Sequence, residues 1–391
     1  MKRLVIIQLK GNSFGGIWQV NKQIAMKLLE EGMDVRVISM RDNPGPFVDE
    51  YDPRLHVHAV NPNELWEFTR KQDVKDTLMK GNLLKTCFLL KKVVHEKIVL
   101  NRDYHALKRE LRALNPDYIL VSHYQIIKGI PKEFYSRTIF HQHCSFTVTK
   151  NHKPTITTLM KYRNQFKFLW LSKAIMKEAK EYGFQNSTYI YNPVRFTVKE
   201  KADVVENKKL VTIARISEEK RIPFMAEIVS EVFGKEKFKD WTFEVYGNGD
   251  NQELEKMKKQ MKYPERMHYM GLTNHPKDVL LTSSLHLNTS KYEGFSLSIL
   301  EANECGVPTI TFPFGEAVYE EIKDNKTGMI VSENTKEKYI SILEEIMSDS
   351  NKLEELSCNV KKFSKQFHID EIIKDWHKLF EQIDGDDYEK N

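Results

Sequence analysis

The chain has 391 residues, 40% of them hydrophobic and 29% charged, with a formal net charge of +5. This composition excludes collagen-like, repetitive and disordered chains, and the length predicts two domains rather than one. Because the sequence shows neither a signal peptide nor an apolar stretch of the ~20 residues that span a bilayer, we expect a cytoplasmic protein.

The start of the chain predicts a strand, a glycine loop, a helix and a second strand. Residues 4–7 are a continuous apolar run, as in a parallel strand buried on both faces. A glycine-containing loop follows at 10–16, and residues 17–31 then carry apolar side chains at helical spacing until Gly32 ends the helix. Residues 35–38 complete a βαβ unit. Later in this half we predict strands at 118–121, 138–140, 168–171 and 188–191, and a helix at 173–182 capped by Ser172.

A local excess of positive charge lies between Arg70 and Arg112. This stretch holds twelve Lys or Arg against five Asp or Glu, a net +7, so the rest of the chain carries −2. Apolar clusters alternate with the cations, which predicts a basic amphipathic helix or helix pair. One interpretation is contact with anionic lipid or a polyanionic acceptor, and the other is a core-packed helix with a solvated face. Nucleic-acid binding is disfavoured because no aromatic stacking platform accompanies the charge.

A second α/β series follows a polar linker at 198–208. Alternating strands and helices in both halves predict two doubly wound parallel sheets, with a ligand cleft between their carboxyl edges. A final amphipathic helix is predicted at 369–383, with a frayed acidic tail from Asp384. The predicted strands of this half are 210–213, 242–246, 286–288 and 309–312, and the helices are 223–234, 252–262, 276–282, 296–305 and 336–348.

Two glutamates, Glu293 and Glu301, flank a loop that runs into a predicted helix start. A helix amino terminus offers unpaired N–H groups and a positive dipole end to a diphosphate. Glu293 can accept hydrogen bonds from hexose hydroxyls, and Glu301 from a ribose diol. At this helix start we also assign substrate binding to Gly294, Phe295, Ser296 and Leu297.

This E-x7-E segment, followed by Gly306 to Ile310, resembles the family-four retaining glycosyltransferases of the GT-B fold. The alternative, two solvated glutamates on a helix, is disfavoured because the resemblance extends over the whole segment from 292 to 302. The resemblance implies an acceptor-binding Rossmann-like domain at 1–198, completed by a helix at 369–391 that crosses back, and a nucleotide-sugar-binding domain at 205–368.

Arg215 and Lys220 follow a predicted strand and resemble the cations that bind the donor diphosphate in that family. A leaving nucleoside diphosphate needs its developing charge stabilised. Two fixed cations can replace Mg²⁺ in this role, so we expect neither a metal nor any cofactor beyond the sugar-nucleotide substrate. The four cysteines are scattered and suggest no zinc site. Solvated surface cations are the competing interpretation.

The remaining site assignments also rest on the resemblance. It implies Tyr246, Gly247 and Asn274 near the base, Gly15 and Gly16 near the donor phosphate and acceptor, and His143 with His141 near the transferred sugar. For the glycines the alternative is turn geometry alone, and for the histidines it is a structural cap on a turn.

The implied reaction transfers glucose or N-acetylglucosamine from a UDP-sugar with retention, to teichoic acid, capsule, exopolysaccharide or a lipid-linked precursor. The acceptor attacks from the face that the diphosphate leaves, and a donor phosphate oxygen takes its proton, which is consistent with the lack of an obvious protein base. Three alternatives stay open. A phosphorylase would need a pyridoxal-phosphate lysine and a longer chain, an epimerase would need acid and base groups in the cleft, and a non-catalytic partner would need neither.

Overall fold

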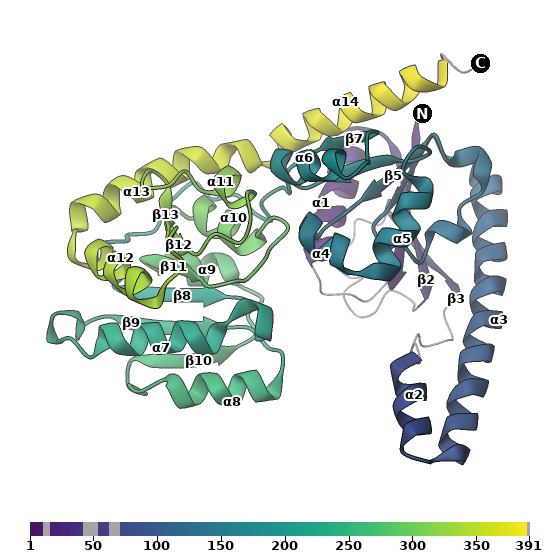
Figure 1. Cartoon of the computed structure of the whole chain (residues 1–391). Coiled ribbons are helices and arrows are strands. Elements are labelled where there is room, and N and C mark those ends of the chain that lie inside the picture. The colour runs from purple at the N-terminus through teal and green to yellow at the C-terminus, as the bar shows by residue number, and fades with distance from the viewer. Residues whose placement is uncertain (11–15, 42–53, 62–70, 389–391) are drawn as a thin grey trace.

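Two α/β domains lie side by side, and the last helix runs from the second domain across the first (Figure 1). The computed structural model describes residues 1–10, 16–41, 54–61 and 71–388. Within these residues every strand pairing is parallel, in a sheet of seven strands and a sheet of six. The predicted pair of doubly wound parallel sheets is therefore confirmed.

The first sheet has the order β3-β2-β1-β4-β5-β6-β7. Its central strands are apolar on both faces because helices cover both of them. The edge strand β3 was not predicted, since it is only half buried and alternates histidine with valine. The strands are β1 (Arg3–Lys10), β2 (Asp34–Arg41), β3 (His56–Asn61), β4 (Tyr118–Val121), β5 (Thr138–His141), β6 (Lys167–Trp170) and β7 (Ser187–Tyr189).

Helices α1 and α14 cover one face of this sheet, against Leu4, Ile6 and Leu120. Helices α3 to α6 cover the other face, against Val5 and Val121. The predicted basic helix pair is confirmed as α2 and α3, and the predicted cap on α6 is confirmed by a 3.1 Å hydrogen bond to its serine hydroxyl. The helices are α1 (Gly16–Glu30), α2 (Lys71–Met79), α3 (Leu83–Leu114), α4 (Phe146–Asn151), α5 (Lys153–Tyr162), α6 (Lys173–Glu181) and α14 (Ile369–Tyr388), with 3₁₀ turns η2 (Ile127–Gly129) and η3 (Lys132–Phe134).

The second sheet has the order β10-β9-β8-β11-β12-β13 and surrounds a separate core. Its strands are β8 (Lys209–Ile213), β9 (Thr242–Tyr246), β10 (Met267–Gly271), β11 (Leu285–Asn288), β12 (Thr309–Thr311) and β13 (Gly328–Ile330). Its helices are α7 (Ile222–Phe233), α8 (Asn251–Gln260), α9 (Pro276–Leu281), α10 (Leu297–Glu304), α11 (Val318–Glu321), α12 (Lys336–Ser348) and α13 (Ser350–Phe363), with 3₁₀ turns η4 (Glu218–Lys220), η5 (Glu236–Phe238) and η6 (Ser364–Phe367).

The carboxyl-terminal segment differs from the prediction. The frayed tail expected from Asp384 is wrong, because α14 continues to Tyr388. Asp384 accepts hydrogen bonds from Lys2 Nζ at 3.0 Å and from the Tyr118 hydroxyl at 2.9 Å, which fixes this end of the helix to the first domain. In the described part of the chain, no helix is both long enough and apolar enough to cross a membrane.

The carboxylate of Glu304, fully buried at the end of α10, ties together the segments that connect the domains. It accepts hydrogen bonds from the Val198 backbone N–H at 2.8 Å, Lys361 Nζ at 2.9 Å, Ser364 Oγ at 2.8 Å and His368 Nε2 at 2.8 Å. Burial alone would raise the pKa of Glu304, but these donors outweigh it and lower the pKa below 4.5. The ionised carboxylate is therefore favoured by the fold.

We expect Glu304→Ala to lower the unfolding free energy by about 3–5 kcal/mol at neutral pH, the range for removing one partner of a buried ion pair. The folded-state pKa is depressed, so this stabilisation is present above pH ~4.5 and is lost as the pH falls through the folded pKa. Urea unfolding of both proteins across this pH range measures the difference. A difference in unfolding free energy between wild type and variant that stays constant down to acidic pH would contradict the assignment of an ionised carboxylate.

Candidate functional site

The amino-terminal end of α10 lies directly against the first domain. A Cβ atom built on Gly294 would lie 2.6 Å from the His143 carbonyl oxygen and 3.2 Å from the Cys144 Cα. A Cβ atom on Gly16, the first residue of α1, would lie 3.1 Å from a methyl carbon of Leu297. The carboxyl edge of β5, the start of α1 and the start of α10 therefore meet at one place, where the sequence predicts the cleft.

Lys220 and Glu293 form an ion pair at this place. Glu293 also accepts a 2.7 Å hydrogen bond from the Ser290 hydroxyl. The η4 turn that carries Lys220 is fixed to the loop after β11, because the Thr289 hydroxyl donates to the Lys220 carbonyl oxygen at 2.9 Å. Both charged groups line a small pocket with His286, whose pKa is lowered to about 3 by burial and then by Lys220. The structure thus brings together a cation and a carboxylate that lie 73 residues apart in the chain.

Arg215 does not join this pair. Its guanidinium is largely exposed and bonds to Glu219 Oε1 at 2.7 Å, one turn further along the loop. Burial raises the pKa of the Cys144 thiol in the first domain. Arg215 lowers this pKa and Glu293 raises it, so both charged groups lie close to Cys144. Arg215 is therefore an exposed cation at the mouth of the site, paired with the partly buried Glu219.

Glu301 lies in the second turn of α10 and is buried. Its carboxylate is paired with Arg195, whose Nη2 lies 3.0 Å from Oε1 and 3.0 Å from Oε2. Burial raises the pKa of Glu301, and Arg195 opposes that rise. Arg195 was not among the predicted site residues, although it stands two residues after the Asn192-Pro193 pair that ends the first domain's last predicted strand.

The other residues assigned to the start of α10 differ in what they contact. The Phe295 ring is buried and stacks on Tyr191 of the first domain at 5.1 Å, so its side chain serves domain packing. The Ser296 backbone N–H donates to Glu321 Oε2 at 3.0 Å. Burial raises the pKa of Glu321 well above its usual value. Leu297 contributes its side chain to the contact with α1 described above.

The two predicted histidines lie one behind the other at the end of β5. Their ring centroids are 3.9 Å apart, and the His141 ring is 5.8 Å from Trp376 of α14. Burial lowers the pKa of His141 to about 3 and that of His143 well below its usual value, so both rings are neutral. His143 touches the Gly294 loop through its carbonyl oxygen, whereas His141 lies deeper, beneath α14.

A third histidine, His123, belongs to the same cluster and was missed. The charge of His123 lowers the pKa of His143, and burial lowers the pKa of His123 itself to about 4. His123 follows β4 by two residues, as His143 follows β5, and this shared offset on neighbouring strands was the signal available in the sequence. His123 Nδ1, His143 Nε2 and both ring nitrogens of His141 are buried without a hydrogen-bond partner among the described residues. These neutral rings can exchange hydrogen bonds with hydroxyl groups.

The residues predicted near a nucleotide base lie along β9 and β10. The Tyr246 hydroxyl bonds to Glu244 at 3.0 Å. Gly247 has φ +144°, and a Cβ there would lie 1.9 Å from the Ala214 carbonyl oxygen, so only glycine fits. Asn274 is exposed in the loop between β10 and α9. Gly15 lies outside the described residues.

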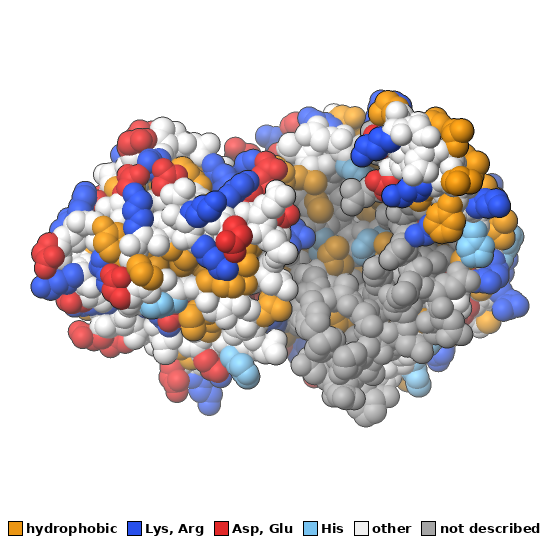
Figure 2. Space-filling view, turned by 90° about the horizontal axis from the view of Figure 1, so that it is seen from below, with side chains coloured by type: hydrophobic (Ala, Val, Ile, Leu, Met, Phe, Trp, Pro, Cys, Tyr) orange, Lys and Arg blue, Asp and Glu red, His pale blue; other side chains and the backbone are white. Residues whose placement is uncertain are grey.

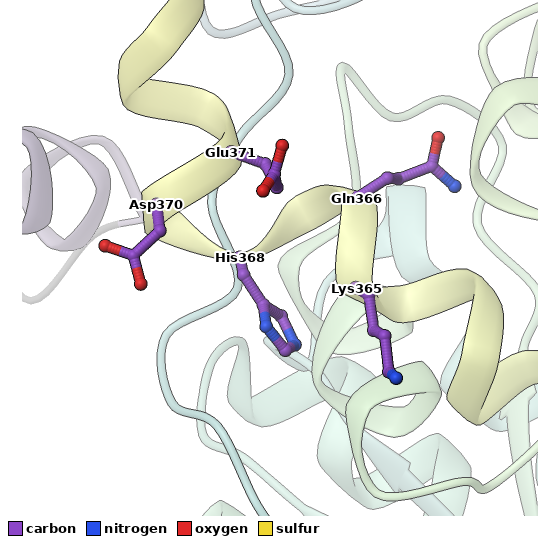
Figure 3. A pocket seen from close by; sticks show the side chains of 5 residues that line it. All are labelled: Lys365, Gln366, His368, Asp370 and Glu371. Carbon is purple, nitrogen blue, oxygen red and sulfur yellow. The ribbon is translucent and has the colours of Figure 1, made fainter.

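A separate hollow lies outside the cleft, where η6 meets α14, lined by Lys365, Gln366, His368, Asp370 and Glu371. Figure 3 shows that Gln366 and Asp370 point in opposite directions, so these side chains do not converge on one point. The interdomain site is therefore the better candidate for the functional site.

Residues 195–363 match the family described as "Glycosyl transferases group 1". An "Uncharacterized glycosyltransferase" of Haemophilus influenzae is 24% identical over 388 residues, which cover 96% of this chain and 99% of that protein. The "Poly(glycerol-phosphate) alpha-glucosyltransferase" of Bacillus subtilis is 20% identical over 269 residues, 66% of this chain but only 39% of the relative.

Among solved structures, a TarM variant of S. aureus in complex with Fondaparinux, alpha-GlcNAc-glycerol and UDP superimposes with a TM-score of 0.74 at 15% identity. The superposition covers 97% of this chain and 100% of TarM, and at this identity it shows a common fold. Residues 195–363 are therefore a group 1 glycosyltransferase domain, and the chain as a whole has the GT-B fold.

Proposed function

We propose that this glycosyltransferase moves glucose or N-acetylglucosamine from a UDP-sugar, with retention and without a metal, to a cell-surface glycopolymer of the teichoic-acid kind or its lipid-linked precursor. The observation that carries the proposal is the Lys220–Glu293 pair at the start of α10, facing the first domain. The relatives support the choice of substrates, because one is a poly(glycerol-phosphate) glucosyltransferase and another was crystallised with UDP and alpha-GlcNAc-glycerol.

In the proposed mechanism the diphosphate takes over the lysine. Lys220 leaves Glu293 and, with Arg215, neutralises the phosphate charge that grows as the bond from the anomeric carbon to the phosphate oxygen breaks. Glu293 is then free to accept hydrogen bonds from the hexose. The acceptor oxygen bonds to the anomeric carbon on the face that the diphosphate leaves, and its proton passes to a diphosphate oxygen.

The first domain binds the acceptor in this proposal. The unpartnered ring nitrogens of His143 and His123 lie at the carboxyl edge of its sheet, on the side of the contact with Gly294. Because burial keeps both rings neutral, they offer hydrogen bonds to the transferred sugar, as predicted for His143, and to the acceptor beside it, without a charge that would compete for the phosphate. We place the reaction in the cytoplasm, at a membrane surface, because residues 70–112 carry a net +7.

The test combines the purified chain with UDP-glucose or UDP-N-acetylglucosamine and with poly(glycerol phosphate) or poly(ribitol phosphate). We expect sugar to appear on a polymer with one of the donors. Conversion of the donor alone to another sugar nucleotide would favour an epimerase. Donor binding in a thermal-shift assay without transfer to any acceptor would favour a non-catalytic role.

Arg195 is expected to matter for donor binding through Glu301. Replacing Arg195 by Gln removes the charge that opposes the burial of Glu301, so its pKa rises further and the carboxylate accepts less well from the ribose diol. We expect the KM for the donor to rise about tenfold, the effect of one charge-assisted hydrogen bond, with little change in kcat. The rise in KM should shrink at higher pH as Glu301 ionises. Arg195→Lys should restore most of the donor affinity, because it keeps the positive charge. A pH-independent KM in Arg195→Gln would contradict this role.

A further inference from the structure

Most of the large apolar side chains that the described residues expose lie on one helical hairpin. Of fourteen such side chains, eight fall between residues 78 and 98. Leu78 and Met79 lie at its tip, at the end of α2. On α3 the exposed apolar residues are Leu83, Leu84, Phe88, Leu90, Val94 and Ile98.

These six residues of α3 share one face. At 3.6 residues per turn they fall within an arc of roughly 160°. The buried residues Leu107 and Leu111 of the helix lie on the opposite side and pack on the first domain. The apolar arc therefore points away from the core, and the described residues of the chain leave it uncovered. Figure 2 shows hydrophobic and Lys/Arg side chains side by side along the right-hand edge of the molecule.

Unpaired cations accompany this apolar face. The exposed lysines of the hairpin are Lys75, Lys80, Lys85, Lys91 and Lys97, and none of them forms an ion pair within the described residues. Some lysines of the second domain are paired instead, as Lys336 is with both Glu227 and Glu231. The hairpin thus presents apolar side chains and uncompensated positive charge together.

The length of α3 places this face beyond the cleft edge of the sheet. The helix has 32 residues, or about 48 Å, whereas the eight residues of β1 span about 26 Å. Since α3 ends just before β4 begins, the excess length extends past the carboxyl ends of the strands, as Figure 1 shows for the α2–α3 hairpin. The tip lies on the side where the acceptor would enter.

We propose that the outward face of the α2–α3 hairpin docks on an anionic lipid bilayer. Apolar side chains flanked by lysines match the acyl boundary and the charged headgroups of such a surface at the same time. A second copy of the chain is disfavoured as the occupant because each copy brings the same net +7 from residues 70–112. A soluble polyanion would engage the lysines but leave the apolar arc exposed. This docking adds a membrane-binding surface to the proposed function. It rests on that function in one respect, the presentation of the glycan acceptor at the same membrane.

Vesicle sedimentation tests the proposal. The full-length chain is expected to sediment with vesicles of phosphatidylcholine mixed with phosphatidylglycerol, and not with phosphatidylcholine alone. The double substitution Leu84→Ser with Phe88→Ser should weaken this binding at least tenfold, and Lys85→Gln with Lys91→Gln should weaken it in a salt-dependent way. Leu272→Ser, which removes a leucine of the second domain about as exposed as Phe88, is the matched control and should bind as wild type.

Equal binding to both vesicle types, or unchanged binding by both double variants, would overturn the proposal. A dimer in analytical ultracentrifugation that the Leu84→Ser, Phe88→Ser variant dissociates, without vesicle binding, would assign the face to self-association instead. Transfer to a soluble acceptor separates the two proposals, because it should be the same in wild type and hairpin variants. If wild type binds vesicles but transfers no sugar, the proposed function fails and the docking surface stands.

Discussion

Replacing Lys220 by Met is expected to lower kcat by about 10²–10³-fold, the range seen when one donor to a developing oxyanion is removed. Lys220 is a partly buried cation of the site and pairs with Glu293, whose place the donor diphosphate would take. The loss should appear in kcat more than in the donor KM, because the charge that the lysine stabilises grows only as the bond breaks. Steady-state kinetics with the competent UDP-sugar measures both.

Lys291→Met is the matched control for this experiment. Lys291 stands two residues before Glu293, is exposed, and pairs with Glu218 at 2.8 Å. An exposed pair of this kind contributes little, so activity should stay close to wild type. If Lys220→Met retained most of its activity, or Lys291→Met lost as much, the assignment of the leaving-group charge to Lys220 would fail.

Gly294→Ala is expected to reduce transfer about 100-fold without unfolding either domain. The added methyl would meet the His143 carbonyl oxygen at 2.6 Å and a methyl carbon of Leu171 at 3.0 Å, both in the first domain. Gly294 has no positive φ, so alanine strains nothing within its own domain. The domains must instead move apart, and a misplacement of about 1 Å between reacting groups costs about 100-fold.

Gly385→Ala provides the control for glycine replacement, since a Cβ there meets nothing within 4 Å. The thermal midpoint should be close to wild type in both variants, and only Gly294→Ala should lose activity. Donor binding by calorimetry should survive in Gly294→Ala, because most of the proposed donor contacts, among them Lys220, Glu293 and Glu301, belong to the second domain. Full activity in Gly294→Ala would show that the contact between the domains is dispensable for the reaction.

Most of the strands predicted from the sequence are buried on both faces, whereas β7 and β9 among them are partly exposed. Residues such as 4–7 and 118–121 form uninterrupted apolar runs because helices cover both sides of the sheet. Strands β3 and β10 were not predicted, because each is a partly exposed edge strand without a continuous apolar run. Strand β13 is buried but only three residues long, which is too short for a clear pattern. Helix α13 does carry leucine and valine at helical spacing after its cap Asp349, so the sequence held the signal although our prediction stopped at 348.

The site was predictable where a motif lies within a few residues and not where partners come from distant segments. Glu293 and Glu301 could be proposed from their spacing, but the pairing of Glu301 with Arg195 joins residues 106 positions apart. The same holds for Glu304, whose four donors come from two distant segments of the chain. Such pairings are set by how the domains pack, which local periodicity does not encode.

The configuration of the bond formed by the wild-type chain tests the central claim most directly. With an α-configured UDP-sugar, a polyol-phosphate acceptor and EDTA in the reaction, nuclear magnetic resonance of the glycosylated polymer should show an α linkage. That result would support retention with Arg215 and Lys220 neutralising the diphosphate. A β linkage, or transfer that requires an added divalent cation, would contradict it.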